Sequence, residues 1–191
     1  TTVTDNFTKL TLNKEYRLIL KPTNDFFLEL DFNGAEIRVL LGLLGLEQPQ
    51  EDVHQWNIEN VFDNELDRPS AKETFFAWLY GSHSPKLAKY VNRLNKNYDK
   101  DTLVNDHWDG EYIRTPFARD IKSDQHHALN YLIQSTAADL ALEQAVKIRD
   151  LIRGRKTKIA FIIHDSVVLD FCSEDKELFN QINGTVSTGK A

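Results

Sequence analysis

The 191-residue sequence predicts an α+β fold in which a helical insertion separates two halves of one sheet domain. Strand-like runs lie near both ends of the chain, and stretches with helical periodicity fill the middle. Apolar residues make up 41% and charged residues 27% of the chain, close to the averages for globular proteins. These values exclude a collagen-like or disordered chain, and no apolar run approaches the roughly 18 residues of a membrane-spanning helix. We therefore expect a protein with a substantial core and no membrane partner.

Two runs before the first helix are expected to form strands. Residues 15–21 are predicted as the first strand, which a proline and turn-prone residues would end. In residues 26–32, apolar and polar side chains alternate with the period of a half-buried strand. Asp31 leaves this strand on the face opposite the main apolar row, at the strand's end. The Asn-Gly pair that follows predicts a turn before a mostly apolar helix over residues 35–46.

The middle of the chain predicts four helices, which cover residues 52–62, 69–80, 85–97 and 125–153. The second of these has clear end signals, with Asp67 as N-cap, Pro69 in the first turn and Gly81 as the stop. After the last helix, the β-rich runs 159–163 and 167–171 flank a three-residue turn, the pattern of a tight hairpin. This hairpin is the second half of the expected sheet.

Two acidic residues are placed for metal chemistry. Asp31 ends an apolar strand, and Asp165 lies at the tip of the predicted hairpin. If the strands are neighbours, both carboxylates can bind the same hard cation through oxygen. Such a pair can hold two Mg²⁺ ions about 3.5–4 Å apart for an in-line phosphoryl displacement. The alternative is that both are ordinary turn residues, which are common at such positions.

The helix over residues 69–80 offers a second chemical face, on which four residues are spaced four apart: Arg68, Lys72, Phe76 and Tyr80. Each step of four advances about 40° round a helix, so all of them fall within an arc of roughly 120°. Two cations followed by two aromatic rings can bind a triphosphate at one end and stack a base at the other. The alternative is an amphipathic helix with Phe76 in the core and solvated cations.

Charge does not decide whether the chain binds nucleic acid. Its 29 acidic and 23 basic residues give a net charge of −6, whereas duplex binders usually carry a basic excess. Basic side chains nevertheless crowd residues 86–100 and 147–158, where a solvated helix face is the ordinary explanation. The single cysteine, Cys172, cannot form an internal disulfide, which favours a reducing compartment such as the cytoplasm.

Five short segments, taken together and in order, resemble the family A DNA polymerases, the DNA polymerase I group. They are Asp31-Phe-Asn-Gly-Ala-Glu36-Ile-Arg38 (motif A), Asp52-Val-His54, the spacing of Arg68, Lys72, Phe76 and Tyr80-Gly81 (motif B, the O helix), Asn130-x-x-x-Gln134-Ser-Thr-Ala-Ala-Asp139, and His164-Asp165-Ser166 (motif C). The order and spacing over more than two thirds of the chain make a chance match improbable.

The resemblance implies a palm domain, whose antiparallel sheet carries catalysis, interrupted by a helical fingers insertion. It implies that residues 1–48 and 125–191 form the palm and residues 49–124 the fingers, with the O helix at 68–80. Because only about 30 residues precede motif A, we expect the thumb and the exonuclease domain to be absent.

The resemblance also implies a role for each matching residue. Two Mg²⁺ ions, with Mn²⁺ as a substitute, would be held by Asp31, Asp165 and the backbone carbonyl of Phe32. The triphosphate would be contacted by Arg68, Lys72 and His54, with Lys72 also a candidate proton donor to the pyrophosphate. The sugar and base would be contacted by Phe76, Tyr80 and Glu36, and the primer–template by Arg38, Asn130, Gln134 and His164.

Four positions depart from the family pattern. Ser166 stands in place of the usual Glu of motif C, Ser135 in place of a Gly, Gly34 in place of a polar residue and His126 in place of an Arg. The change at residue 166 matters most, because it removes a carboxylate that could tune the metals. These departures and the small size suggest a phage or prophage enzyme, which would act in the host cytoplasm.

We expect template-directed DNA synthesis, in which the primer 3′-hydroxyl attacks the α-phosphate of a dNTP. The expected partners are primer–template DNA, dNTPs and a processivity or thumb-bearing protein. The first alternative is a catalytically incomplete fragment or split-polymerase subunit that binds primed DNA or nucleotide. The second is a small metal-dependent phosphohydrolase reusing Asp31 and Asp165, which would release phosphate from dNTPs without a template.

Overall fold

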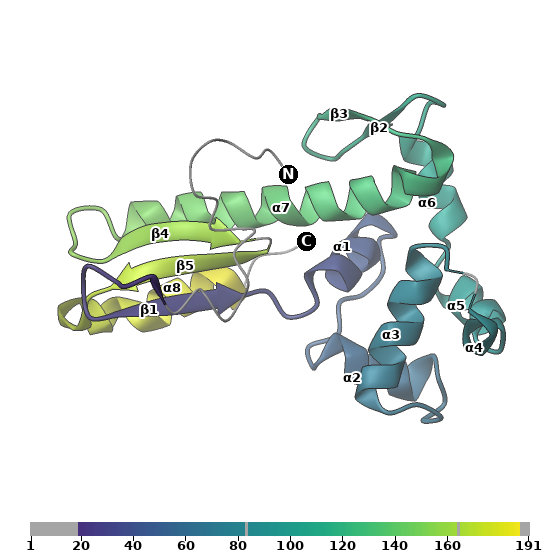
Figure 1. Ribbon diagram of the computed structural model, residues 1–191, viewed down its shortest axis with the longest axis horizontal. Coiled ribbons are helices and arrows are strands. Elements are labelled where there is room, and N and C mark those ends of the chain that lie inside the picture. Colours follow the sequence, from purple (N-terminus) through teal and green to yellow (C-terminus); the bar gives the residue numbers. More distant parts are fainter. Residues whose placement is uncertain (1–18, 83, 164, 188–191) are drawn as a thin grey trace. The chain divides into compact units, whose positions relative to one another are not determined.

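The structure, a computed structural model, describes residues 19–82, 84–163 and 165–187 (Figure 1). Its elements in chain order are β1 (Phe26–Asp31), α1 (Ala35–Leu43), α2 (Val53–Asn60), α3 (Arg68–Leu79), α4 (Pro85–Ala88), α5 (Val91–Asn97), α6 (Lys100–His107), β2 (Tyr112–Arg114), β3 (Asp120–Lys122), α7 (Gln125–Leu151), β4 (Lys158–Ile163), β5 (Ser166–Phe171), the 3₁₀ helix η3 (Ser173–Leu178) and α8 (Phe179–Ser187). None of these helices is both long and apolar enough to cross a membrane.

The chain divides into two compact units. The sheet unit is described over residues 19–32 and 141–187, and the helical unit over residues 33–82 and 84–140. One border lies directly after β1 and the other lies within α7. The division into palm and fingers at the residues named above stays a prediction.

A three-stranded antiparallel sheet with the order β1-β5-β4 forms the sheet unit. β1 pairs with β5 over its whole length, so that Asp31 stands opposite Ser166. β4 and β5 form a hairpin that the Ile163–Ser166 pair closes. The sheet is therefore assembled from both ends of the chain around a helical insertion. This confirms the predicted fold class, with its strand before the helices and its hairpin after them.

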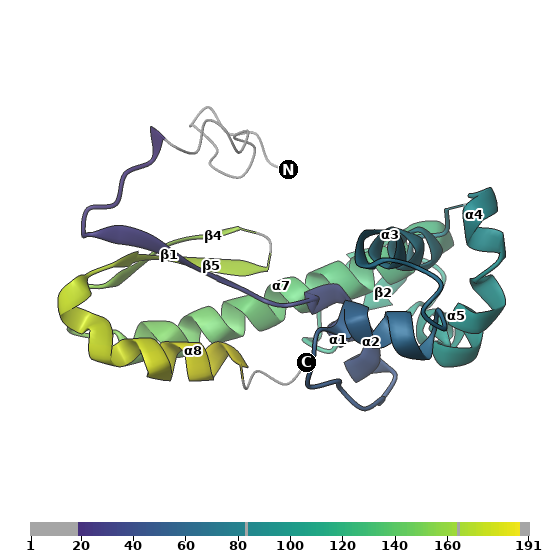
Figure 2. The ribbon, with the colours of Figure 1, turned by 90° about the horizontal axis from the view of Figure 1, so that it is seen from below.

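The part of α7 that belongs to this unit and helix α8 lie on the same face of the sheet (Figure 2). Apolar side chains from that face and from the helices form one buried cluster, which includes Leu30, Ala145, Ile148, Ile152, Val167, Leu169 and Ile182. Side chains of a strand alternate between its faces, so Glu29 and Asp31 lie on the side of β1 away from this cluster.

Most of the strand predicted over residues 15–21 falls outside the part of the chain that the structure describes. Residues 15–18 lie outside the described residues, and residues 19–21 form no strand. In the turn that follows, the Asp170 carboxylate accepts hydrogen bonds from the backbone N–H of Thr23 at 3.0 Å and of Asn24 at 2.8 Å. A side chain of β5 thus satisfies the backbone donors of the turn that leads into β1.

The helical unit packs around a core from several of its helices. Its largest fully buried side chains include Ile37, Leu40, Phe62, Phe75, Leu94 and Tyr98. Within this unit α3 confirms the predicted helix over residues 69–80 and its end signals. The Asp67 carboxylate accepts a hydrogen bond from the Ser70 N–H at 2.9 Å, and Gly81 adopts a φ of +74° after the last turn.

Helix α1 ends three residues before the predicted end at residue 46. Gly45 adopts a φ of +65°, and the Leu46 N–H bonds to the Leu41 carbonyl at 2.9 Å. This is the Schellman arrangement, which a glycine two residues after the last helical residue favours. The long helix α7 matches the prediction closely and ends at Leu151 instead of residue 153.

The predicted helix over residues 85–97 is wrong, because the chain forms two short helices, α4 and α5. Between them the Tyr90 N–H bonds to the Leu87 carbonyl at 2.8 Å, a spacing of three residues instead of four. The Tyr90 ring is buried and packs edge-on against Phe62 at 5.3 Å between ring centroids. Burial of this ring explains why the helix is interrupted there.

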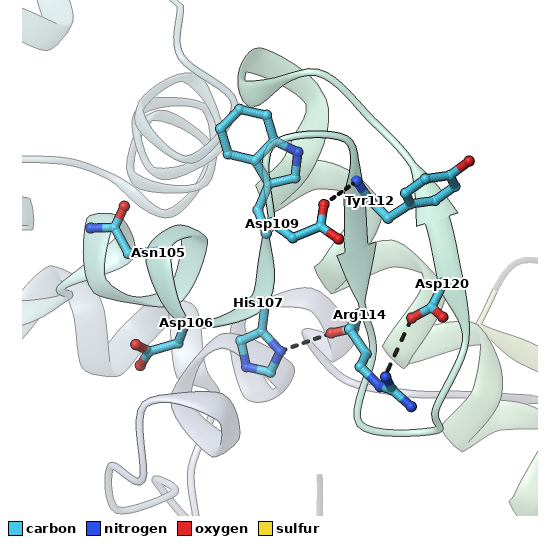
Figure 3. A pocket seen from close by; sticks show the side chains of 8 residues that line it. Asn105, Asp106, His107, Asp109, Tyr112, Arg114 and Asp120 are labelled. Atoms are coloured by element: carbon cyan, nitrogen blue, oxygen red, sulfur yellow. Dashed lines mark hydrogen bonds and ion pairs between the residues drawn. The ribbon is translucent and has the colours of Figure 1, made fainter.

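The polar stretch before α7 holds α6 and the β2–β3 hairpin, for which the sequence carried no prediction. They form an open pocket of about 550 Å³ (Figure 3), lined by Asn105, Asp106, His107, Trp108, Asp109, Tyr112, Arg114 and Asp120. His107 Nδ1 lies 2.8 Å from the Arg114 carbonyl oxygen, and the Asp109 carboxylate accepts the Tyr112 N–H at 2.7 Å. These contacts join α6 to the hairpin, and none of the predicted site residues lines the pocket.

Candidate active site

The two predicted metal-binding acids come from adjoining positions of the sheet unit. Asp31 ends β1 opposite Ser166, and Asp165 immediately precedes Ser166 in the tight turn of the hairpin. Cα atoms of paired residues in antiparallel strands are roughly 4.5–5.5 Å apart, so the two acids are close neighbours. Asp31 is exposed and Asp165 half-buried, which leaves both carboxylates accessible to a ligand. His164, which belongs to the same motif, lies outside the described residues.

The donors at this edge suit a hard cation that shares its coordination shell with a substrate. They are the two carboxylates and the backbone carbonyl of Phe32, which directly follows β1. Within the part of the chain that the structure describes, no three His, Cys, Asp or Glu side chains are grouped to hold a metal ion. Mg²⁺ is commonly bound by one or two carboxylates together with substrate phosphates and water, so this small set of oxygen donors fits it.

Side chains of α3 line up in the helical unit as their spacing predicts. Phe76 and Tyr80 stack, with ring centroids 5.9 Å apart and planes 18° from parallel. Lys72 Nζ lies 5.9 Å from the centroid of the Phe76 ring. This face therefore presents a cation followed by two stacked rings.

The first residue of this face, Arg68, is paired with Asp52 at the start of α2. Arg68 Nη2 lies 2.6 Å from Asp52 Oδ2, and the Arg68 side chain stays half exposed. The other carboxylate oxygen of Asp52 caps α2 by accepting the His54 N–H at 2.8 Å. Burial alone would raise the pKa of Asp52, but the hydrogen bonds from Arg68 and from backbone N–H groups outweigh it and lower the pKa. Sequence reasoning assigned no role to Asp52, although an Asp directly before a helix is an N-cap signal.

His54 lies beside this face and is buried, with 3% of its surface exposed. Its ring centroid is 6.2 Å from that of Phe76. Burial lowers the pKa of His54, and the positive charge of Lys72 lowers it further. His54 is therefore neutral at pH 7, with one ring nitrogen to donate a hydrogen bond and one to accept.

Tyr80 connects α3 to two other helices of the helical unit. Its hydroxyl donates a hydrogen bond to Glu36 Oε1 of α1 at 3.1 Å, and the Gln134 side chain of α7 lies close enough to affect its pKa. Burial raises the pKa of Tyr80, and the negative charge of Glu36 raises it further. The hydroxyl therefore stays protonated and holds Glu36 toward the stacked rings.

Two residues predicted to contact DNA have different surroundings. The Arg38 guanidinium donates to the backbone carbonyls of Asn33 and Pro49, both at 2.9 Å, and of Glu51 at 3.1 Å. Arg38 thus holds the loop between α1 and α2. Asn130 is half-buried on α7, and its Oδ1 atom has no hydrogen-bond partner among the described residues. An unsatisfied buried acceptor is costly, so this side chain is the better placed of the two to accept a ligand's donor.

No protein-family model and no curated protein matches this sequence. Among solved structures, the chain is similar to the "POL domain of Pol1 from M. smegmatis complex with DNA primer-template and dNTP", with a TM-score of 0.67 and 17% sequence identity. The match covers 88% of this chain and 37% of that chain, so the present chain spans little more than a third of that protein. The chain therefore has the fold of part of a Pol1-type, family A-like polymerase domain.

Proposed function

We propose that this chain is the palm-and-fingers region of a family A DNA polymerase and extends a primer on a DNA template. The observation that carries the proposal is the pairing of Asp31 with Ser166, because it brings the motif A and motif C acids to adjoining positions at one end of the sheet. The fold shared with a polymerase domain supports it independently. The order of the five motifs along the sequence supports it further.

Asp31, Asp165 and the Phe32 carbonyl would hold two Mg²⁺ ions, for which Mn²⁺ can substitute. When bound, such ions lower the pKa of the primer hydroxyl and offset the charge that develops on the phosphate oxygens. The sheet supplies rigidity, because both acids lie at ends of strands joined by a continuous ladder. Rigid carboxylates cost little reorganisation during the reaction.

The side chains of the helical unit would bind the dNTP. Lys72 and Arg68 are cations suited to a triphosphate, and neutral His54 can donate a hydrogen bond to a phosphate oxygen without adding charge. Lys72 would also transfer a proton to the departing pyrophosphate. Phe76 and Tyr80 present stacked rings for the base and the sugar.

The remaining predicted residues would position the sugar and the DNA. Glu36, held by Tyr80, would occupy the space that a ribose 2′-hydroxyl needs. Gln134 and Asn130 would donate or accept hydrogen bonds at the minor groove of the primer–template. Arg38 and His164 are proposed for the same groove on the strength of the motif alone.

A primer-extension experiment tests this function directly. The full chain, a 5′-labelled primer on a defined template, Mg²⁺ and one dNTP at a time should give single additions dictated by the template base. Asp31→Asn and Asp165→Asn are the matched variants, since each removes charge while keeping size. We expect each to slow incorporation roughly a hundredfold or more with an unchanged circular dichroism spectrum.

Two results would contradict the proposal. Near wild-type rates in both variants would remove the metal assignment. Phosphate release from dNTPs in the absence of a template would instead favour a phosphohydrolase.

A second candidate is a subunit of a split polymerase, which agrees with a fold that matches part of a polymerase chain. In that case the chain would bind primed DNA or dNTP but extend primers only with a thumb-bearing partner. Fluorescence anisotropy with labelled primer–template distinguishes the two, because binding without extension is expected of the split subunit alone.

A further inference from the structure

Glu29 lies on the same side of β1 as Asp31, two residues earlier. Its strand neighbours Leu28 and Leu30 belong to the apolar cluster on the other side of the sheet. Ser166 stands directly opposite Asp31, and side chains of paired residues project from the same face. Glu29, Asp31 and Ser166 therefore share one face of the sheet.

The Glu29 side chain extends toward Asp31's end of the strand. Its own partner across the ladder is Val168, yet its Oε1 atom lies 3.1 Å from Ser166 Oγ, two residues further along β5. The Ser166 side chain is buried, with 3% of the residue exposed, and its hydroxyl has a second acceptor within reach, the Ile163 carbonyl at 3.1 Å. The hydroxyl shares its one proton between these two acceptors, and the contact orients the carboxylate of Glu29, an exposed residue.

This geometry adds a third negative charge beside the two acids of the proposed cation site. Ser166 is the cross-strand partner of Asp31 and the chain neighbour of Asp165, so a carboxylate bound to its hydroxyl lies at the same end of the sheet as both. Among the described residues no three His, Cys, Asp or Glu side chains are grouped to hold a metal ion, so we assign Glu29 no role as a third ligand. Its contribution is then the electrostatic attraction of a fixed charge near a divalent ion.

We propose that Glu29, oriented by Ser166, is a positioning residue that strengthens binding of divalent cations by Asp31 and Asp165. The proposal rests on the proposed function, since it concerns the same metal site. Ser166 has no charge of its own, and Glu29 of β1 supplies a negative charge at this end of the sheet. Partners that surround metal ligands typically change metal affinity by about 10–100-fold when they are replaced.

Cation binding can be measured without any reaction. Mn²⁺ is titrated into the full chain, with neither DNA nor nucleotide present, and the free ion is followed by electron paramagnetic resonance. We expect Glu29→Gln to weaken Mn²⁺ binding about tenfold or more, because the amide keeps the size of the side chain and removes its charge. Ser166→Ala should weaken it less, and should add nothing in a Glu29→Gln background.

Glu174→Gln is the matched control. Glu174 is an acidic residue of the same unit and lies in η3, which follows the end of β5 opposite to Ser166. Its carboxylate pairs with Lys156 at 2.7 Å, and Mn²⁺ affinity should stay within about twofold of wild type, as expected for an exposed ion pair far from the site. Circular dichroism of each variant checks the fold. The Mg²⁺ concentration that gives half-maximal primer extension should rise in Glu29→Gln and not in Glu174→Gln.

The outcomes separate this inference from the proposed function. If Asp31→Asn loses Mn²⁺ while Glu29→Gln binds it as wild type does, the role of Glu29 is refuted and the metal site stands. If wild type and Asp31→Asn bind Mn²⁺ equally weakly, the cation site itself is refuted, and the role of Glu29 with it.

Discussion

Replacing Tyr80 with Phe is expected to weaken the choice of deoxyribose over ribose, because the Tyr80 hydroxyl holds the Glu36 carboxylate in place. The two oxygens are 3.1 Å apart, and both side chains are partly buried. A hydrogen bond to a charged group contributes about 1.5–3 kcal/mol, and partial exposure puts this bond near the lower limit, about 1.5 kcal/mol. That value is the free energy that keeps Glu36 beside the stacked rings.

The same value limits the effect on selectivity. If Glu36 excludes the 2′-hydroxyl, displacing the Glu36 side chain costs about 1.5 kcal/mol less in Tyr80→Phe than in wild type. A difference of about 1.36 kcal/mol corresponds to a tenfold change in rate. We therefore expect the ratio of kcat/KM for dATP over ATP to fall by up to about tenfold. Glu36→Ala should lower the ratio at least as far, and Tyr80→Phe should then have no further effect.

The assay is single-turnover incorporation of dATP and of ATP opposite the same template thymine. It is run on wild type, both single variants and the double variant, with urea unfolding to check that each remains folded. An unchanged ratio in Glu36→Ala would refute the argument, and so would additive effects of the two substitutions. Glu36 would then merely favour the N-terminus of α1 by its charge, worth about 0.3–1 kcal/mol.

Three further predictions concern binding and pH. Lys72→Ala should raise the KM for dNTPs and lower kcat, with primer–template affinity nearly unchanged, and an equal loss of DNA affinity would show that this face binds DNA instead. Burial lowers the pKa of the His54 ring in the folded chain below its ordinary value of 6.5. At a pH just below 6.5, the unfolded chain therefore binds a proton on this ring and the folded chain does not. Unfolding free energy should therefore fall as pH drops from about 7 to 5, and His54→Gln should flatten this slope in urea titrations at each pH. Hydrogen bonds from Lys89 and Arg93 lower the pKa of Glu65 from 4.5 to about 2, so its stabilisation is complete above pH 4.5 and is lost as the pH falls toward 2. Glu65→Gln should remove that pH dependence, and an unchanged acid-unfolding curve would contradict it.

Local signals in the sequence were sufficient for much of the fold. The alternation in residues 26–32 predicted β1, since the two faces of a strand meet different surroundings. Asp67 and Gly81 predicted both ends of α3, because capping and a positive φ depend on only a few neighbouring residues. Where a local prediction was wrong, a contact with a residue elsewhere in the sequence determined the local structure. Tyr90 interrupts the helix over residues 85–97 because its ring is buried against Phe62.

The sequence by itself determined the fold class, the alignment of Lys72, Phe76 and Tyr80 on one helix, and the candidate acids Asp31 and Asp165. These depend on residue spacing and on backbone geometry, which repeat at a known period. Only the tertiary structure decided which distant residues meet, and these include pairs 44 and 137 residues apart: Tyr80 with Glu36, and Ser166 with Glu29. No periodicity encodes such pairs. They arise when strand register and burial of a common core bring separate segments together. The free energy of these contacts depends on residues far apart in the sequence, so a short stretch of sequence does not predict them.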